Sequence, residues 1–282
     1  MWDGKNLNGK TLMIWREQGL GDEILFMSII NDVIKYVGNN IILETDHRLV
    51  NIIQRTFPDI LVRKQTFSIH PPLHTVKTDF DFHIPMGELM RFYRSDINQF
   101  NQSKPYIKVN DIFKDKFNER LLDYKDKIKI GICWRSGTMD PIRNLDSYSI
   151  DKLEVLFNQK EFVFVNLQYD DCEDELLFAE EKFNIKIIRW GDIDLKNDLD
   201  DVFALMSELD YVVTVGTAVY EMSGAVGTKT FVPCLKHSWH DLGHNIYPWF
   251  NNVKLFKGDN NCVHLMLPEI LNEIRNDFCS KK

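Results

Sequence analysis

The sequence lacks the features that mark membrane, secreted and disulfide-rich proteins. Its 282 residues contain no apolar run of about 20 residues, the length that a membrane-spanning helix needs. The first residues lack a basic segment followed by an apolar one, so no secretory signal is expected. The five cysteines are scattered without a CxxC pair, which disfavours a disulfide framework and a structural zinc site. We therefore expect a cytoplasmic protein with reduced thiols.

The sequence also lacks an excess of basic charge. Its net charge of -8 disfavours a protein that binds nucleic acid by electrostatic attraction, so no nucleic-acid partner is expected. Residues 4–11 (GKNLNGKT) match the P-loop pattern, but they run into an expected strand and do not join a strand to a helix, which argues against a P-loop NTPase. What is present is 44% hydrophobic and 27% charged residues, the balance of a soluble globular protein. The chain length suits two ordinary cores better than one large core.

The first part of the chain alternates short apolar runs with segments of helical spacing. Expected strands cover residues 10–15, 41–44, 60–62 and 80–84, and expected helices cover residues 24–38 and 47–57. This alternation indicates parallel βαβ units. Residues 100–126 then change character, with a charged helix expected from residue 111, and we place a domain boundary after residue 125.

The second part repeats this pattern. Expected strands cover residues 128–134, 162–167, 185–188, 211–215 and 230–232, and expected helices cover residues 173–183, 200–209, 218–226 and the closing 267–278. The predicted fold class is α/β, with two Rossmann-like domains, residues 1–125 and 126–282, that face each other across a central cleft. Ligands of such sheets bind beyond the carboxyl ends of the strands.

The loop after the first expected strand contains Gly19, Gly21 and Asp22. The glycines permit a positive φ or a close backbone approach, and they bring Asp22 to the N-terminus of a helix. Asp22 has two interpretations there, a residue stabilised by the helix dipole or a catalytic carboxylate. A dinucleotide-binding fingerprint fits less well, because Ile24 replaces its third glycine. Glu44, expected at the end of the second strand, keeps a nicotinamide-type oxidoreductase as an alternative.

Polar residues also follow the strands of the second part. Arg135, Ser136 and Gly137 offer a cation, a hydroxyl and a flexible backbone after residues 128–134. Arg143 could add charge near a diphosphate, although a lone arginine is more often only solvated. Gln168, at the end of another strand, fits either contact with a base or sugar or a cap of the sheet edge.

The segment after residues 211–215 opens the next expected helix. Thr217 and Ala218 place backbone amides where a phosphate could bind. The small residues that follow also suit simple packing of the helix on its sheet. His237, His240 and His244 would share one face of a helix, but no fourth metal ligand is evident. Trp239 fits an aromatic wall beside a ligand or a place in the core.

Short motifs follow one another through most of the chain: WDG (2–4), GKTL (9–12), EQGLGD (17–22), IGICWRSG (130–137), VNLQ (165–168), DLDDVFA (198–204), LDYVVTV (209–215), TA (217–218), SGAVG (223–227) and YPWF (247–250). Their order resembles that of the heptosyltransferase-like glycosyltransferases of family 9. The resemblance is greatest to the subgroup often found C-terminal to tetratricopeptide repeats. It covers nearly the whole chain.

The resemblance implies a GT-B fold and an inverting transfer that requires no metal or other cofactor. Asp22 matches the aspartate proposed as the general base of the family, in an N-terminal domain that takes the acceptor. The C-terminal domain would bind a nucleotide-diphosphate sugar. Expected donor-binding residues are Gly19, Gly21, Arg135, Ser136, Gly137, Arg143, Gln168, Gly216, Thr217, Ala218 and Glu221. The acceptor would be a glycan or another hydroxyl compound, and an acceptor at a membrane would be met from the surface.

Two departures from the family pattern bear on activity. The family usually has Asp-Thr where this chain has Gly216-Thr217, and usually has His where this chain has Glu221. Gly216 removes a carboxylate that is expected near the donor, and Glu221 could accept hydrogen bonds from sugar hydroxyls instead. The alternative to an active transferase is therefore a degenerate GT-B module that binds a nucleotide or glycan without transfer.

Overall fold

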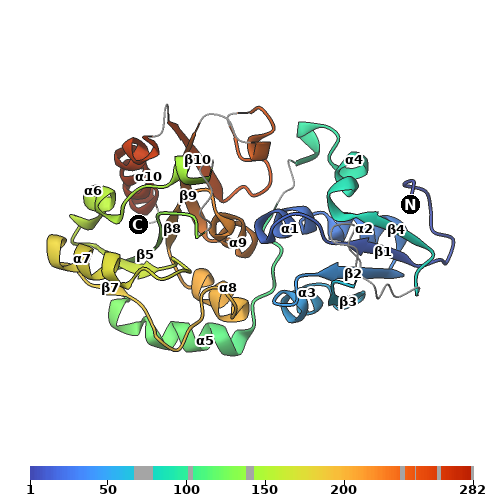
Figure 1. Ribbon diagram of the computed structural model, residues 1–282, viewed down its shortest axis with the longest axis horizontal. Helices are drawn as coiled ribbons and strands as arrows, with labels where there is room; N and C mark the ends of the chain where they lie inside the picture. Colours follow the sequence, from blue (N-terminus) through green and yellow to red (C-terminus); the bar gives the residue numbers. More distant parts are fainter. Residues whose placement is uncertain are drawn as a thin grey trace. The chain divides into compact units, whose positions relative to one another are not determined.

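The computed structural model describes residues 1–66, 79–100, 104–137, 143–235, 239–244, 246–258 and 262–280 (Figure 1). The chain divides into two compact units, residues Met1–Lys108 and Val109–Lys282. Each unit contains one parallel sheet with helices between its strands, which confirms the predicted α/β class. None of the helices in the described ranges is long and apolar enough to cross a membrane.

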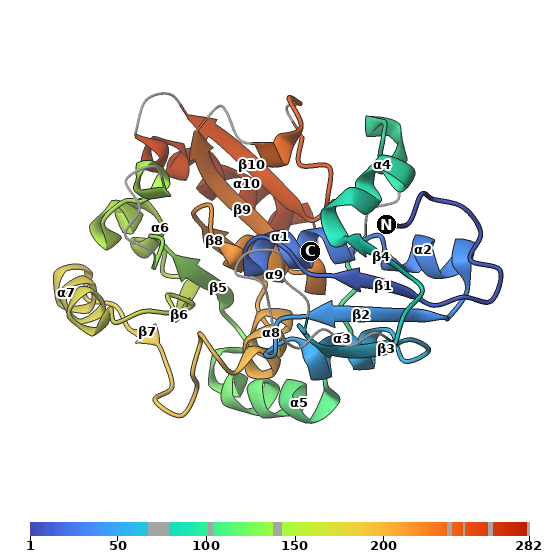
Figure 2. The same ribbon diagram turned by 45° about the vertical axis from the view of Figure 1, so that its right-hand side comes forward.

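The first unit is built on a four-stranded sheet in the order β3-β2-β1-β4. Its strands are β1 (Leu12–Trp15), β2 (Ile41–Thr45), β3 (Leu61–Lys64) and β4 (Phe82–Pro85), and its helices are α1 (Leu20–Met27), α2 (Ile30–Val37), α3 (Val50–Thr56) and α4 (Met90–Tyr93). Every residue of β1 and β2 is buried, as expected for central strands covered on both faces. All four strands run in the same direction (Figure 2).

The helix expected over residues 24–38 is two helices, α1 and α2. At the C-cap of α1, the Ser28 N–H bonds to the carbonyls of Leu25 and Phe26, so the last turn tightens and the helix ends. The apolar residues of both helices keep one overall spacing, which is why the sequence pattern does not reveal the break. Gly38 ends α2, as expected, with a positive φ of 83°.

The second unit contains a six-stranded sheet in the order β10-β9-β8-β5-β6-β7. The strands are β5 (Ile128–Cys133), β6 (Phe162–Asn166), β7 (Ile187–Ile188), β8 (Tyr211–Thr214), β9 (Lys229–Leu235) and β10 (Val253–Gly258). The chain starts in the middle, builds outward through β6 and β7, and then reverses through β8. This is the doubly wound order, whose ligand crevice lies where the strand order reverses, here between β5 and β8.

The sequence analysis did not predict β10. In this edge strand Lys254 and Lys257 interrupt the apolar residues, so it lacks the continuous apolar run of its neighbours. Lysines are common on edge strands because they discourage pairing with other chains. Its register against β9 runs from Val253 opposite Thr230 to Gly258 opposite Leu235.

The helices of the second unit are α5 (Asp111–Arg120), α6 (Glu154–Phe157), α7 (Glu173–Phe183), α8 (Leu199–Ser207), α9 (Ala218–Val226) and α10 (Leu267–Ser280). Single 3₁₀ turns are η1 (Met86–Leu89), η2 (Ile97–Phe100), η3 (Leu122–Tyr124), η4 (Arg143–Asp146), η5 (Ile150–Leu153), η6 (Trp239–Asp241) and η7 (Val263–Met266). Helices α5 and α8 lie side by side (Figures 1 and 2). Lys116 of α5 binds Asp201 of α8 at 2.8 Å, which explains why the second unit begins before α5 rather than after it.

Helix α9 is buried along most of its length. The Thr217 side chain caps its N-terminus by accepting the Val219 N–H, and Gly227 ends it with a φ of 98°. A β-carbon on Gly224 would lie 2.6 Å from Cδ2 of Phe250, so only glycine permits this close packing. The helix therefore has little freedom to move, and the loop before it has a fixed end.

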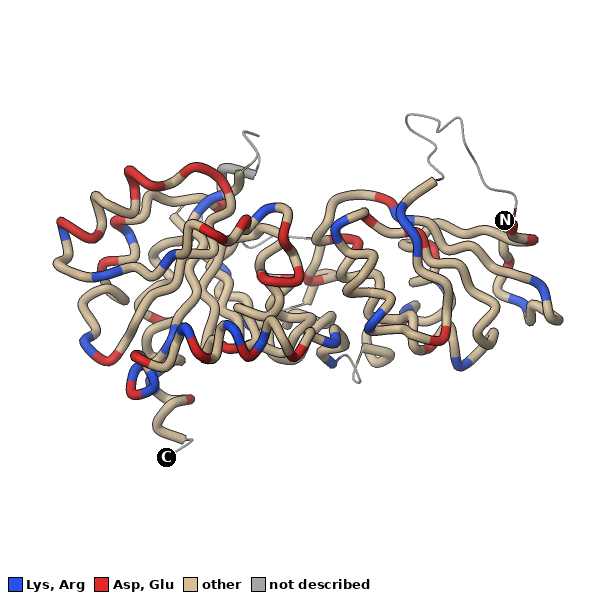
Figure 3. The backbone as a smooth tube through the Cα atoms, turned by 90° about the horizontal axis from the view of Figure 1, so that it is seen from below, with Lys and Arg blue, Asp and Glu red and all other residues tan. Residues whose placement is uncertain are grey.

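Lys and Arg residues are interspersed with Asp and Glu residues along both units (Figure 3). Several of these charges form local pairs, such as Arg189 with Glu173 at 2.7 Å and with Glu180 at 2.9 Å. Partly exposed pairs of this kind contribute little to stability individually. The charges with more consequence are those buried at the ends of strands.

Candidate functional site

In the loop after β1, the Asp22 carboxylate accepts a hydrogen bond from the loop backbone. The Gly19 N–H donates to Oδ2 of Asp22 at 3.1 Å, and a β-carbon on Gly19 would lie only 3.2 Å from that oxygen. Gly19 is extended, with a φ of -82°, and Gly21 is helical, so the positive φ of this loop falls on Gln18, at 63°. Glycine at 19 thus serves close approach. Asp22 lies in the first turn of α1, partly exposed, where the helix dipole favours its charge.

A buried ion network lies beside Asp22, and the sequence analysis did not single it out. Glu23 is fully buried, and its carboxylate binds Nε of Arg16 at 2.8 Å and accepts the Asp46 N–H at 2.9 Å and the Thr45 hydroxyl. Asp46 in turn binds Nη1 of Arg16 at 3.2 Å and Nε of Arg48 at 2.9 Å. These residues follow β1 and β2 at the carboxyl edge of the sheet. Charged residues directly after two apolar runs were the available signal.

The fold shifts the pKa values of the two carboxylates of this network, Glu23 and Asp46, in opposite directions. Burial raises the pKa of Glu23, against the opposing effects of the Arg16 charge and of its hydrogen bonds. Burial would also raise the pKa of Asp46, but hydrogen bonds from Arg48 and the charges of Arg48 and Arg16 outweigh it and lower this pKa to about 2. Asp46 is therefore the anion that the fold requires.

Acid should weaken the first unit through Asp46. Its pKa is about 2 in the folded protein, against an ordinary 3.8, so folding favours the carboxylate. That stability is present above pH 4 and is lost as the pH falls from 4 towards 2. We expect urea midpoints of the wild type to exceed those of Asp46→Asn at pH 6 and to approach them by pH 2. The pKa of Glu23 is shifted upwards, so its effect on stability has the opposite pH dependence, but Glu23 is present in both proteins. A constant difference between the two proteins across this range would contradict the assignment.

Glu44, the candidate ribose-binding acid of the dinucleotide alternative, lies inside the structure. Its side chain is fully buried, and its carboxylate binds Nε of Arg63 at 2.9 Å and accepts the N–H of Thr66 at 2.9 Å. The residue that ends β2 is Thr45. Glu44 therefore connects β2 to β3 and presents no carboxylate at the open edge of the sheet.

In the second unit, the loop after β5 contains Arg135, Ser136 and Gly137. The Arg135 guanidinium binds Glu175 at 2.7 Å, the Asp171 carbonyl at 2.9 Å and the Asp170 carboxylate. Burial alone would lower the pKa of Arg135, but these carboxylates raise it. Arg135 is therefore engaged with the start of α7, and its contact with a diphosphate stays a prediction.

The next two backbone amides of this loop donate to side-chain hydroxyls. The Ser136 N–H donates to Oγ of Ser147 at 3.2 Å, and the Gly137 N–H donates to the Tyr169 hydroxyl at 3.1 Å. A β-carbon on Gly137 would lie 2.6 Å from Cε2 of Tyr169, so the glycine makes room for that ring. The Ser147 hydroxyl can rotate away and leave the Ser136 amide for a ligand oxygen, whereas the Gly137 amide becomes available only if the Tyr169 ring moves.

The side chain of Gln168 holds the loop after β5 in place through hydrogen bonds. Its side chain is buried; Oε1 accepts the N–H groups of Trp134 and Arg135, each at 3.3 Å, and Nε2 donates to the Arg135 carbonyl at 3.1 Å. These bonds form a cap of the sheet edge. The side-chain amide of Gln168 therefore fixes the position of the first residues of the segment 134–137. Gln168 also lines the pocket described below, and its contact with a base or sugar stays a prediction.

The loop after β8 lies next to the loop after β5. The Val215 N–H donates to the Cys133 carbonyl at 3.1 Å, and Sγ of Cys133 lies 3.8 Å from Oγ1 of Thr217. Burial raises the pKa of Cys133 to about 11, so this thiol stays neutral and is a poor nucleophile. Gly216 is exposed, and Ala218 begins α9. The fold thus brings Arg135–Gly137 and Gly216–Ala218 together at the reversal of strand order.

Glu221 lies in the first turn of α9, but it points into the protein. The residue is 2% exposed, and its Oε1 lies 3.5 Å from Nε2 of His240. The His240 ring stacks on Trp239 at 3.9 Å between centroids, and Trp239 remains 51% exposed. His237 and the side chain of Arg143 lie outside the described residues. Within the described part of the chain, no group of three or more His, Cys, Asp or Glu could hold a metal ion.

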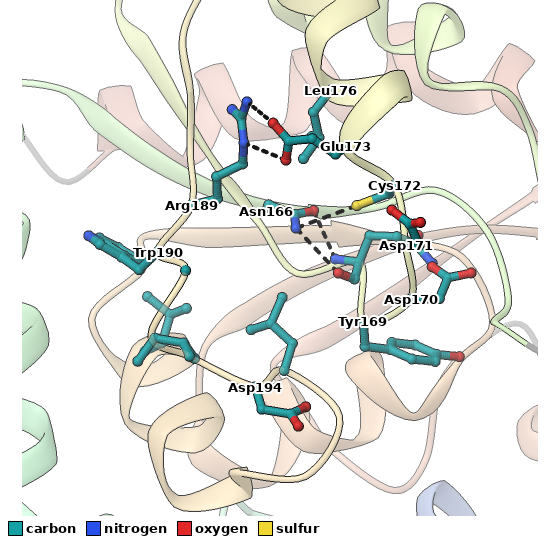
Figure 4. Close-up of a pocket in the computed structure, with 15 residues that line it drawn as sticks. Asn166, Tyr169, Asp170, Asp171, Cys172, Glu173, Leu176, Arg189, Trp190 and Asp194 are labelled. Atoms are coloured by element: carbon teal, nitrogen blue, oxygen red, sulfur yellow. Dashed lines mark hydrogen bonds and ion pairs between the residues drawn. The ribbon is translucent and has the colours of Figure 1, made fainter.

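A pocket of about 390 Å3 opens next to this crevice, at the carboxyl ends of β6 and β7 (Figure 4). Trp190 lies at one side and Tyr169 at the other, and Asp194 comes from the segment before α8. Asp170, Asp171 and Glu173 add acidic groups to its wall. The sequence analysis did not predict this pocket, although only two residues separate Asp170 and Asp171 from the expected strand 162–167.

Known proteins resemble this chain in sequence and in fold. No protein-family model matches the chain. Protein FlbA of Caulobacter vibrioides is 32% identical over 265 residues, a match that spans 90% of this chain and 44% of FlbA. The chain therefore spans less than half the length of this relative.

Solved structures of glycosyltransferases superpose on most of the chain. A family 9 glycosyltransferase from Veillonella parvula has a TM-score of 0.64 at 11% identity, over 93% of this chain and 96% of that one. The E. coli ADP-heptose heptosyltransferase II gives 0.58 at 10% identity, over 95% and 99% of the two chains. The E. coli heptosyltransferase WaaC, solved with ADP-2-deoxy-2-fluoro heptose, gives 0.57 at 11% identity, over 95% and 99%. This chain therefore has the fold of the family 9 glycosyltransferases.

Proposed function

We propose that the protein is an inverting glycosyltransferase of family 9, which moves a sugar from a nucleotide-diphosphate donor to an acceptor hydroxyl. The observation that carries the proposal is the pair of loops that meet between β5 and β8, at the reversal of the strand order. Crevices at this point of a doubly wound sheet bind nucleotides and other ligands. In the proposed arrangement, the two units face a central cleft, with the acceptor on the first unit and the donor on the second.

The donor diphosphate would bind the amides of Ser136 and Gly137 and the N-terminus of α9 at Thr217 and Ala218. Backbone N–H groups at a helix N-terminus bind anions and need no metal. The neighbouring pocket would take the nucleoside. Its carboxylates repel phosphate but accept hydrogen bonds from ribose hydroxyls, and the rings of Trp190 and Tyr169 suit a base. Both substructures belong to the second unit, and Gly19 and Gly21 of the first unit are the further residues expected to bind the donor.

Asp22 would act as the general base. The acceptor oxygen attacks the anomeric carbon, and its proton passes to the Asp22 carboxylate as the bond from that carbon to the phosphate oxygen breaks. The bonding pair leaves with the nucleoside diphosphate, whose growing charge the loop amides stabilise. Attack opposite the leaving group inverts the anomeric centre. The proposed setting is the cytoplasm, the proposed acceptor is a glycan or other hydroxyl compound, and the subgroup is the one associated with tetratricopeptide repeats.

A second candidate, a module that binds a nucleotide or glycan without transfer, is favoured by two observations. Gly216 provides no carboxylate beside the donor loops, and the side chains of Arg135 and Glu221 are turned to protein partners. A binding module would show the same ligand affinity in the wild type and in Asp22→Asn, with no turnover in either protein.

Ligand-dependent melting tests the donor site directly. With one nucleoside diphosphate series at about 100 times its Kd, we expect the melting temperature of the full chain to rise by roughly 5–10 °C, with EDTA present. A panel of nucleotide sugars and their nucleoside diphosphates covers the common bases. No shift with any member would contradict the proposed function, and a shift only with Mg2+ would contradict metal independence.

A further inference from the structure

Asp146, the last residue of η4, lies where three loops of the second unit converge. Its Oδ1 accepts the N–H of Leu235, at the carboxyl end of β9, at 3.0 Å. Its Oδ2 lies 3.6 Å from the point where a β-carbon at residue 216 would stand, beside the loop after β8. The next residue, Ser147, accepts the Ser136 N–H of the loop after β5. The carboxylate is thus fixed at the reversal point of the sheet.

The empty side-chain position at 216 gives this carboxylate its access. Gly216 is exposed, and its φ lies outside the left-handed region, so the position needs glycine for no backbone reason. Asp146 is half-buried, with one oxygen committed to Leu235 and the other directed towards Gly216. Burial raises the pKa of Asp146, while the Leu235 N–H lowers it. A carboxylate in this place is costly unless it meets a hydrogen-bond donor.

The chemistry of the neighbouring groups selects the ligand group. An ionised carboxylate accepts hydrogen bonds and donates none, so it repels a phosphate but favours a hydroxyl. The amides of Ser136 and Gly137 have the opposite preference. A ligand that spans both must carry an anionic part next to a part rich in hydroxyls, and a nucleotide-diphosphate sugar has this order.

We propose that Asp146 binds a hydroxyl of the donor sugar and so contributes to sugar specificity. The proposal rests on the proposed function of the second unit as a donor site. It assigns Asp146 to the sugar and leaves the diphosphate to the loop amides.

The test compares Asp146→Asn with the wild type in calorimetric titrations in EDTA. The probes are the nucleotide sugar that raises the wild-type melting temperature most and the matching nucleoside diphosphate. Asn retains an oxygen for the Leu235 N–H, so its amide nitrogen faces the position of Oδ2. We expect Kd for the nucleotide sugar to rise about tenfold, because a hydrogen bond to a charged group is lost, and Kd for the diphosphate to stay within about twofold. Asp151→Asn, whose carboxylate binds Ser149 and Lys182, is the matched control and should change neither value.

Moving the carboxylate across the gap provides the second measurement. Gly216→Asp alone places two carboxylates together and should weaken sugar binding, whereas Gly216→Asp combined with Asp146→Asn should recover part of the tenfold loss. A purely structural Asp146 would not be rescued in this way.

The outcomes distinguish a failure of the proposed function from a failure of the role of Asp146 alone. A wild type that binds no nucleotide sugar overturns the proposed function and this proposal with it. A wild type that binds, with Asp146→Asn binding equally well, overturns this proposal alone. Equal loss of sugar and free diphosphate binding in a folded Asp146→Asn also overturns it, by assigning Asp146 to the phosphate.

Discussion

Replacing Asp22 by Asn is expected to lower kcat by about 10²–10⁴-fold, the usual contribution of a general base. Asn keeps an oxygen that can accept the Gly19 N–H, so the first turn of α1 should remain intact. It cannot take the acceptor proton at neutral pH. Initial rates of sugar transfer under saturating donor measure the loss, and donor titration by calorimetry should give an unchanged Kd.

A carboxylate at the amino end of the same sheet, just before β3, provides the control for this substitution. Asp59 is exposed in the same unit, and Asp59→Asn should retain wild-type turnover. Turnover of Asp22→Asn within threefold of the wild type would exclude Asp22 as the base.

Replacing Glu23 by Ala should produce the largest loss of stability, about 3–5 kcal/mol of the free energy of unfolding. The substitution leaves Nε of Arg16 buried without its carboxylate, and the Thr45 hydroxyl and Asp46 N–H without an acceptor. Urea unfolding measures the loss. Hydrogen exchange assigns it to the first unit, because amides of β1 and β2 should exchange faster while those of β5 and β8 do not.

An exposed ion pair gives the comparison for Glu23. Glu88 and Arg91 pair at 3.1 Å on the surface of the first unit, and Glu88→Ala should cost at most about 0.5 kcal/mol. Glu23→Gln keeps the volume and one acceptor and should fall between the two. If Glu23→Ala and Glu88→Ala cost the same, the buried network contributes no special stability.

The sequence predicts the regular elements well where one physical signal decides them. Helix α9 runs from Ala218 to Val226, as expected, because Thr217 caps one end and Gly227 terminates the other. The break at Ser28 between α1 and α2 has no such marker, since Ser28 stops the helix through backbone bonds that any residue could make. Strand β10 was missed because its lysines disrupt the apolar run.

The sequence predicts which loops form the candidate site, but it does not predict the directions in which their side chains point. The positions of Arg135 and Glu221 after a strand and at a helix start are as the sequence suggests. Their side chains turn to Glu175 and His240, partners that are distant in sequence. Asp146 shows the reverse case, since nothing in the residues around it indicates that its carboxylate would lie beside Gly216. Pairings of this kind depend on how the strands are ordered, which local patterns do not encode.

The strand order of the second unit also has a consequence for synthesis. β5 is the first strand of this sheet to leave the ribosome, yet one of its edges pairs with β8, which begins only at Tyr211. At about 5–20 residues per second, that edge waits several seconds for its neighbour. During this interval β5, apolar over most of its length, exposes unpaired backbone groups of the kind that recruit other chains. Slow translation between β5 and β8 should therefore lower the yield of soluble protein, and a chaperone that shields apolar strands should restore it.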